Sequence, residues 1–127
     1  MAESIELAPQ PTSVSVARHW TTDVLARVDA GEVADTMALL VSELVSNVVL
    51  HARTPCSLRI DRHADRIRVE VDDESDQVPE AGVLADPLAA SGRGLLLVDG
   101  LSSAYGVDRR PTGGKSVWFE LDVPGPA

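Results

Sequence analysis

Residues 43–52, Glu-Leu-Val-Ser-Asn-Val-Val-Leu-His-Ala, place polar side chains four residues apart within an apolar helical pattern. Glu43 and Asn47 are four residues apart and His51 continues the row, so a helix stacks all three on one face. Apolar residues recur beside this row at steps of three and four, which predicts a helix over residues 33–51 with a wide buried face. That face comprises Met37, Leu40, Val41, Leu44, Val48 and Val49. The polar row therefore adjoins the buried side of the helix.

An amide beside a carboxylate on one helix face is a candidate site for chemistry. Asn47 offers a carbonyl oxygen, and Mg²⁺ binds few protein ligands together with phosphate oxygens. The Glu43 carboxylate can orient or deprotonate an attacking hydroxyl or water. Taken alone, however, the row is better explained as a solvated helix face on which the Glu, Asn and His side chains hydrogen-bond to one another.

Upstream of this helix, the sequence predicts a strand and another helix. Residues 4–8 form a short edge strand, which prolines stop. A helix capped by Ser13 or Ser15 then runs to about residue 29. Its apolar residues recur at four-residue steps and predict one buried stripe. The stripe comprises Val16, Trp20, Val24 and Val28.

Downstream, apolar and polar residues alternate in two strands, residues 56–61 and 66–71, whose short connection is typical of a hairpin. Residues 72–93 have no regular period, and a loop of this length is usually functional or disordered. A short helix is expected over residues 94–101. Two closing strands follow, and they span residues 104–109 and 116–123.

This order of elements predicts a single domain over residues 1–127. Consecutive strands joined by short turns pair in the antiparallel sense. The helices must bury their apolar faces against the sheet. We therefore expect an α+β fold, a two-layer sandwich with helices on one face of a mixed, mostly antiparallel sheet.

A second candidate stretch is the acidic run Asp72-Asp73-Glu74-Ser75-Asp76, which directly follows a strand. A carboxylate at a strand end can accept a hydrogen bond from an adenine amino group where the pocket is dry. Strand alternation points Asp73 inward with Val71, which favours Asp73 over Asp72 as that acceptor. Taken alone, the run is better explained as an acidic, flexible turn.

The third stretch, Ser91-Gly92-Arg93-Gly94-Leu95, opens the predicted short helix. Gly92 and Gly94 let the backbone approach phosphate oxygens closely. The N–H groups of the first helical turn, which Leu95 enters, then point at the anion, and Arg93 adds a charge-assisted contact. A single Gly-x-Gly is also common in flexible loops. The order and context of the three stretches strengthen one another.

Composition limits the ligands and the surroundings. The formal net charge is −9 and the arginines are scattered, so we expect no nucleic-acid partner. The same repulsion disfavours an anionic membrane surface, and we expect no apolar run of the roughly 20 residues that a spanning helix needs. Cys56 is the only cysteine, which excludes an intramolecular disulfide and fits a small core residue in a cytoplasmic protein.

Four motifs together resemble the GHKL superfamily of ATPases, named for gyrase, a heat-shock chaperone, histidine kinases and a mismatch-repair protein. The motifs are ELVSNVVLHA at residues 43–52, VEVDDES at 69–75, GRGLLLVD at 92–99 and GGKSVWFEL at 113–121. The resemblance covers nearly the whole chain and implies the Bergerat α/β sandwich. Within the superfamily, the chain looks most like the stand-alone anti-sigma-factor serine/threonine kinases of bacteria.

The resemblance implies ATP and Mg²⁺ as cofactors and gives each motif a role. Asn47 matches the asparagine that ligates Mg²⁺, and Glu43 matches the glutamate that acts as general base. Asp73 matches the aspartate that bonds the adenine amino group. Gly92 and Gly94 match the glycines that hold the phosphates beneath a mobile lid.

Other positions follow from the same resemblance. The lid corresponds to residues 76–91, and Arg93 and Leu95 belong to the phosphate-binding turn. Ser116 falls where the family places a hydroxyl near adenine on a late strand. Ser75 is a departure, because the wider family usually has glycine there, and this change can alter the packing around adenine.

The implied function is a kinase that phosphorylates a serine or threonine on a partner protein, with Glu43 taking the hydroxyl proton. By resemblance, the partners are an anti-sigma-factor antagonist as substrate and a sigma factor as sequestered ligand, and a homodimer is implied by analogy. Two alternatives stay open. One is an ATP-binding regulatory module without transfer, and the other is an interaction domain with an empty pocket.

Overall fold

The structure is a computed structural model that describes residues 2–75 and 104–123. Its helices are α1 (Thr12–Arg27), the 3₁₀ turn η1 (Gly31–Val33), α2 (Ala34–Asn47) and the π-helical turn η2 (Val48–Ala52). Its strands are β1 (Ala2–Leu7), β2 (Cys56–His63), β3 (Arg66–Asp73), β4 (Ala104–Arg109) and β5 (Lys115–Asp122).

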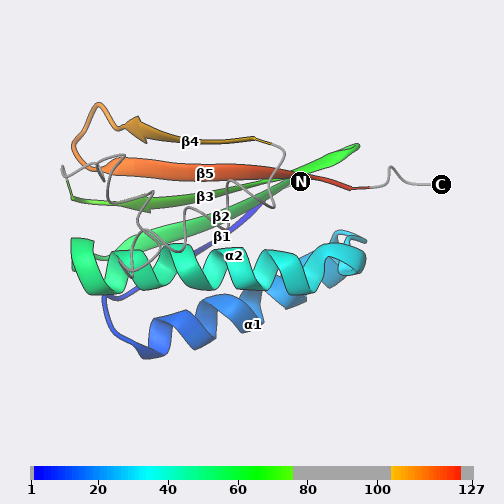
Figure 1. The fold of residues 1–127 in the computed structure, drawn as a ribbon, viewed down its shortest axis with the longest axis horizontal. Helices are drawn as coiled ribbons and strands as arrows, with labels where there is room; N and C mark the ends of the chain where they lie inside the picture. The colour runs from blue at the N-terminus through cyan, green and yellow to red at the C-terminus, as the bar shows by residue number, and fades with distance from the viewer. Residues whose placement is uncertain (1, 76–103, 124–127) are drawn as a thin grey trace, which may run out of the picture.

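The five strands form one sheet in the order β1-β2-β3-β5-β4, and both long helices cover the same face of it (Figure 1). The expected α+β two-layer sandwich is confirmed. All four strand pairings are antiparallel, so the expectation of a mixed sheet was wrong for the described residues. The reason is that β5 lies between β3 and β4 and is antiparallel to both of them. This order places β3 at the centre of the sheet.

The core lies between the helices and the inner face of the sheet. Strand alternation sends every second residue of β2, β3 and β5 inward, and α2 buries the face that its periodicity predicts. The inner layer includes Leu40, Val41, Leu44, Leu58, Ile60, Val69, Val71 and Phe119. Full burial of a side chain such as Phe119 stabilises the fold by about 1.5–3 kcal/mol.

Helix α1 differs from its sequence-based prediction in its cap and its buried face. No side-chain cap bond forms at its start, and the Ser13 hydroxyl instead donates to the carbonyl oxygen of Ala8 (2.7 Å). Val16 is 48% exposed, whereas Ala17 and Thr21 are fully buried. Of the predicted stripe, Val24 is fully buried and Trp20 and Val28 pack against the core, so apolar periodicity was wrong only for Val16 and missed the small buried residues.

The α2 region is long and apolar enough to pass a membrane-span criterion, contrary to expectation. Residues 31–52 form a 22-residue helical stretch with mean hydropathy 1.6. A core helix of a globular domain passes the same test of length and composition. Here the apolar side chains of α2 join the core cluster with the sheet, so the stretch is explained by packing.

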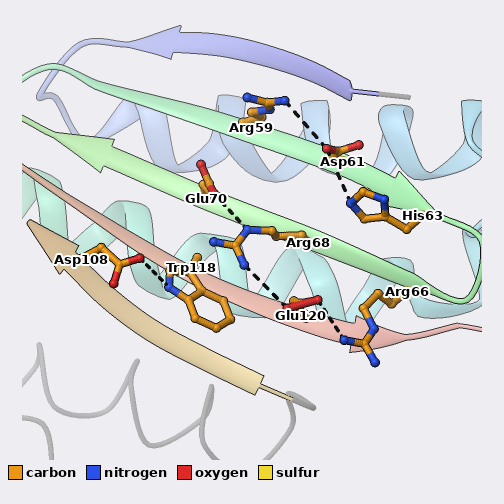
Figure 2. Close-up of polar contacts among 9 residues, drawn as sticks. All are labelled: Arg59, Asp61, His63, Arg66, Arg68, Glu70, Asp108, Trp118 and Glu120. Carbon is orange, nitrogen blue, oxygen red and sulfur yellow. Dashed lines mark hydrogen bonds and ion pairs between the residues drawn. The ribbon is translucent and has the colours of Figure 1, made fainter. Parts of the chain in front are cut away.

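The outer face of the sheet carries charged side chains that contact one another (Figure 2). Arg68 Nε lies 2.9 Å from Glu70 Oε1, and its guanidinium stacks 4.2 Å from the centroid of the Trp118 ring. Glu120 lies between Arg68 (3.6 Å) and Arg66 (3.3 Å). Trp118 Nε1 donates to Asp108 Oδ2 (3.1 Å). Among residues 2–75 and 104–123, these contacts cover this face of the sheet without a second helical layer.

Candidate functional site

Several elements converge at one end of the sheet. Figure 1 shows the C-terminal end of α2, the end of β3 and the start of β5 at the same end of the molecule. The strand register agrees, because Cys56 pairs with Asp73 and Asp73 pairs with Lys115. Only three residues separate η2 from β2. The end of α2 is therefore held close to this cross-strand row.

Asp73 and Lys115 form a buried ion pair at the centre of the convergence. Their residues are 1% and 6% exposed, and Lys115 Nζ lies 2.9 Å from Asp73 Oδ2 and 3.1 Å from Oδ1. Asp73 is on the inner face with Val71, as strand alternation predicts. Burial makes each charge dependent on the other, because an unpaired charge in this position is costly.

The chain leaving β3 is tied back onto this pair. The Ser75 N–H donates to Asp73 Oδ1 (2.9 Å), which uses the backbone rather than the side chain of this residue. The Glu74 N–H donates to Thr54 Oγ1 (3.0 Å), in the link between η2 and β2. Together these bonds fix the carboxylate of Asp73 and join the end of β3 to the segment that follows α2.

Lys115, a residue that the sequence motifs did not single out, lies beside Asp73, next to the expected Ser116. Ser116 pairs with Asp72 and points to the outer face, whereas Lys115 points inward. Because neighbouring residues of a strand face opposite sides, Ser116 lies on the face opposite Asp73, and its position near adenine stays a prediction. The available signal was that Lys115 is the only lysine and lies one residue before an alternating strand.

Gly114 explains why the approach between these strands is so close. It has φ +84°, in the left-handed region, and a Cβ at this position would overlap the backbone carbonyl oxygen of Asp73. Glycine is therefore required for the start of β5 to pass beside the end of β3. Gly114 belongs to the motif at residues 113–121, but the motif alone does not indicate why a glycine is needed here.

The structure places Glu43 and Asn47 on consecutive turns of α2, both half-buried, with Asn47 at the last α-helical residue. His51 does not complete the expected row, because it lies in η2 and is exposed. A π turn bonds residue i to i+5, so a four-residue step no longer stacks side chains there. π turns inside helices occur frequently at functional sites.

The expected phosphate-binding turn, Gly92, Arg93, Gly94 and Leu95, lies outside the described residues, as does the expected lid over residues 76–91. The described part of the site therefore consists of the α2 end and the strand row. Asn47 presents an amide oxygen, a ligand type that suits Mg²⁺, and Glu43 presents a carboxylate one turn away. These donor types fit a metal–phosphate ligand.

Cys56 completes the row on the other side of Asp73. Burial, followed by the negative charges of Asp73, Glu6 and Asp72, raises the pKa of the Cys56 thiol to about 11. The thiol is therefore protonated near neutral pH and behaves as a small core residue. Its structural interpretation agrees with the sequence-based one.

Comparisons with known proteins identify the fold and the family. Residues 7–121 match the profile of the histidine kinase-like ATPase domain. Among solved structures, the chain is similar to the histidine kinase domain of the blue-light activated histidine kinase from Erythrobacter litoralis EL346, with 22% identity and a TM-score of 0.57. The alignment covers 88% of this chain and 60% of that one.

A search of curated proteins gives no match. The structural likeness establishes the fold, and the profile covers most of the chain, including Glu43, Asn47, Asp73 and Lys115. The chain thus belongs to the family of histidine kinase-like ATPase domains, within the GHKL superfamily.

Proposed function

We propose that the chain binds Mg-ATP and transfers the γ-phosphoryl group to a serine or threonine of a partner protein. The observation that carries this proposal is the buried Asp73 carboxylate, held at the end of the central strand beside the end of α2. A carboxylate at 1% exposure accepts a hydrogen bond from an adenine amino group without competition from water.

The helix supplies the groups for the phosphate side of the site. Asn47 would hold Mg²⁺ through its amide oxygen, and the metal neutralises the phosphates when bound. Glu43, one turn earlier, would accept the proton of the attacking hydroxyl. The turn of Gly92, Arg93, Gly94 and Leu95 would add backbone N–H groups to the phosphates.

The resemblance to anti-sigma-factor kinases supports the choice of partners. The substrate would be an anti-sigma-factor antagonist and the sequestered ligand a sigma factor, in the cytoplasm, and analogy adds a homodimer. The net charge of −9 supports protein rather than nucleic-acid partners.

Two measurements on the intact chain test the proposal. Mg-ATP should raise the melting temperature by an amount that grows with ligand concentration. Radiolabelled γ-phosphate should appear on a serine or threonine of a co-purified partner. No rise in melting temperature at millimolar Mg-ATP would remove the proposal altogether. A rise without transfer would favour the regulatory module.

A pair of matched variants separates binding from transfer. Glu43→Gln should lower transfer by about 10²–10⁴-fold and leave the ATP-induced rise intact, because it removes only the general base. Glu32→Gln makes the same change at an exposed residue of η1, at the other end of the α2 segment, and should retain both properties. Equal transfer by the two variants would show that Glu43 is not the base.

A further inference from the structure

Lys115 combines burial, charge and position in a way that the proposed function does not use. It is the only lysine of the chain, is 6% exposed and points into the row that contains Asp73. Within residues 2–75 and 104–123, it is the one buried cation. A lysine is seldom buried without a specific partner or task.

The hydrogen bonds at the pair leave one donor next to one acceptor. Asp73 Oδ1 accepts hydrogen bonds from Lys115 Nζ and from the Ser75 N–H, and Lys115 Nζ lies 2.9 Å from Oδ2 as an ion pair. A carboxylate has about four acceptor positions and an ammonium has three donors. At least one position on Oδ2 and one N–H of Lys115 are therefore unused by the described residues. Each partner is satisfied by the other, and a ligand can use the remaining donor and acceptor together.

The ligand edge that matches this pair has a donor directly beside an acceptor. The adenine edge has that order, with the amino group at C6 beside the bare nitrogen N1. Taking the proposed function as given, we infer that Lys115 is a specificity-determining residue that donates a hydrogen bond to N1 of the adenine whose amino group bonds Asp73. The two members of the ion pair then bind the amino group and N1 of the base together.

Gly114 and Ser75 hold this reading edge in place. Gly114 brings β5 against the carbonyl of Asp73, and the Ser75 N–H fixes the rotation of the carboxylate. Lys115 is thus positioned by backbone contacts at both partners. An ammonium group held in a fixed position by Asp73 favours a ring nitrogen with a lone pair. It disfavours a C–H at the same position of the ring.

Binding of 1-deaza-ATP, which replaces N1 by C–H and keeps the amino group, tests the inference. The wild-type chain should bind Mg-1-deaza-ATP roughly 10-fold or more weakly than Mg-ATP, because a hydrogen bond from a charged donor is lost. Lys115→Met should bind the two nucleotides equally. Arg109 is exposed and is the residue of β4 opposite Lys115 in the strand register. Arg109→Met is the matched control and should keep the wild-type ratio of the affinities for the two nucleotides.

A second measurement covers the case in which Lys115→Met fails to fold, since that change leaves Asp73 buried without its partner. Selective ¹⁵N-lysine labelling of the wild-type chain gives one side-chain ammonium signal, because there is one lysine. The signal should shift with Mg-ATP more than with Mg-tripolyphosphate, which lacks a base.

The inference is overturned if the wild-type chain binds both nucleotides equally and its ammonium signal shifts by the same amount with and without a base. That result leaves ATP binding itself standing. Absence of any ATP binding defeats the proposed function instead.

Discussion

At the scale of single residues, Gly114 is the position where one added methyl group should cost most. Its φ of +84° and the carbonyl oxygen of Asp73 both exclude a side chain. We expect Gly114→Ala to lower the free energy of unfolding by about 3 kcal/mol, measured by urea denaturation. Gly31→Ala is the matched control, because a Cβ at Gly31 meets nothing within 4 Å. Equal stability of the two variants would contradict the close approach of β5 to Asp73.

Cys56 gives a prediction about pH. The pKa of its thiol is raised from 9.0 to about 11, so the unfolded chain releases this proton at a lower pH than the folded chain. The unfolded state binds fewer protons between these values, and stability therefore falls as pH rises from about 9 to about 11. Below pH 9 the contribution is fully present.

The measurement is urea denaturation of the wild-type chain and of Cys56→Ala at several pH values. The difference in unfolding free energy between the two should shrink as pH rises through this window. Iodoacetamide should modify the native thiol slowly at pH 8, because the thiolate is the nucleophile. Rapid native-state alkylation at pH 8 would show that the thiol is not held protonated.

At this scale the sequence predicted Asp73 but not Lys115. Alternation along one strand is enough to point Asp73 inward with Val71. Lys115 depends on the register between β3 and β5, which pair residues 42 positions apart in the chain. A lysine is normally exposed, so nothing in the local pattern singled out Lys115, and the resemblance pointed to the hydroxyl of Ser116 instead.

At the scale of elements, the pairing of β4 with β5 depends on the fit between Gly106 and Trp118. A Cβ at Gly106 would come within 2.8 Å of the Trp118 ring. Gly106→Ala should displace the ring from Arg68 and Asp108 and lower stability by about 1 kcal/mol, since an exposed cation–π contact and a hydrogen bond are each weak. Trp118 fluorescence in a Trp20→Phe background should report the displacement. Unchanged emission would contradict it.

The helices show which element properties follow from sequence. In α2 the buried residues have large side chains, so apolar periodicity found the right face. In α1 the buried face contains Ser13, Ala17 and Thr21, whose close packing leaves Val16 outside. The π turn after Asn47 depends on how α2 meets β2, which helix propensity does not encode.

At the scale of the whole molecule, topology puts the site at the end of the central strand. In the order β1-β2-β3-β5-β4, β3 has neighbours on both sides, so Asp73 is enclosed by Cys56 and Lys115. The helices cover one face of the sheet (Figure 1), and the other face carries the charged contacts of Figure 2. The alternation of inward and outward residues therefore separates the candidate site from the solvated side of the sheet.

From the overall charge we expect the proposed nucleotide binding to require Mg²⁺. The chain carries a net charge of −9, which repels the triphosphate of ATP unless a cation reduces that repulsion. Excess EDTA should therefore abolish most of the rise in melting temperature caused by ATP. It should leave the smaller rise caused by adenosine, which has no phosphates, unchanged.

Asn47→Ala should reproduce the effect of EDTA while Mg²⁺ is present, because it removes the proposed metal ligand and keeps the base-binding pair. Ser46→Ala, the adjacent half-buried residue on α2, is the matched control and should respond to Mg-ATP as the wild type does. The four melting curves per variant are those with Mg-ATP, ATP with EDTA, adenosine with Mg²⁺, and no ligand. An ATP response equal with and without EDTA would mean that the charge of the chain is offset by its own side chains, and Asn47 would lose its proposed role.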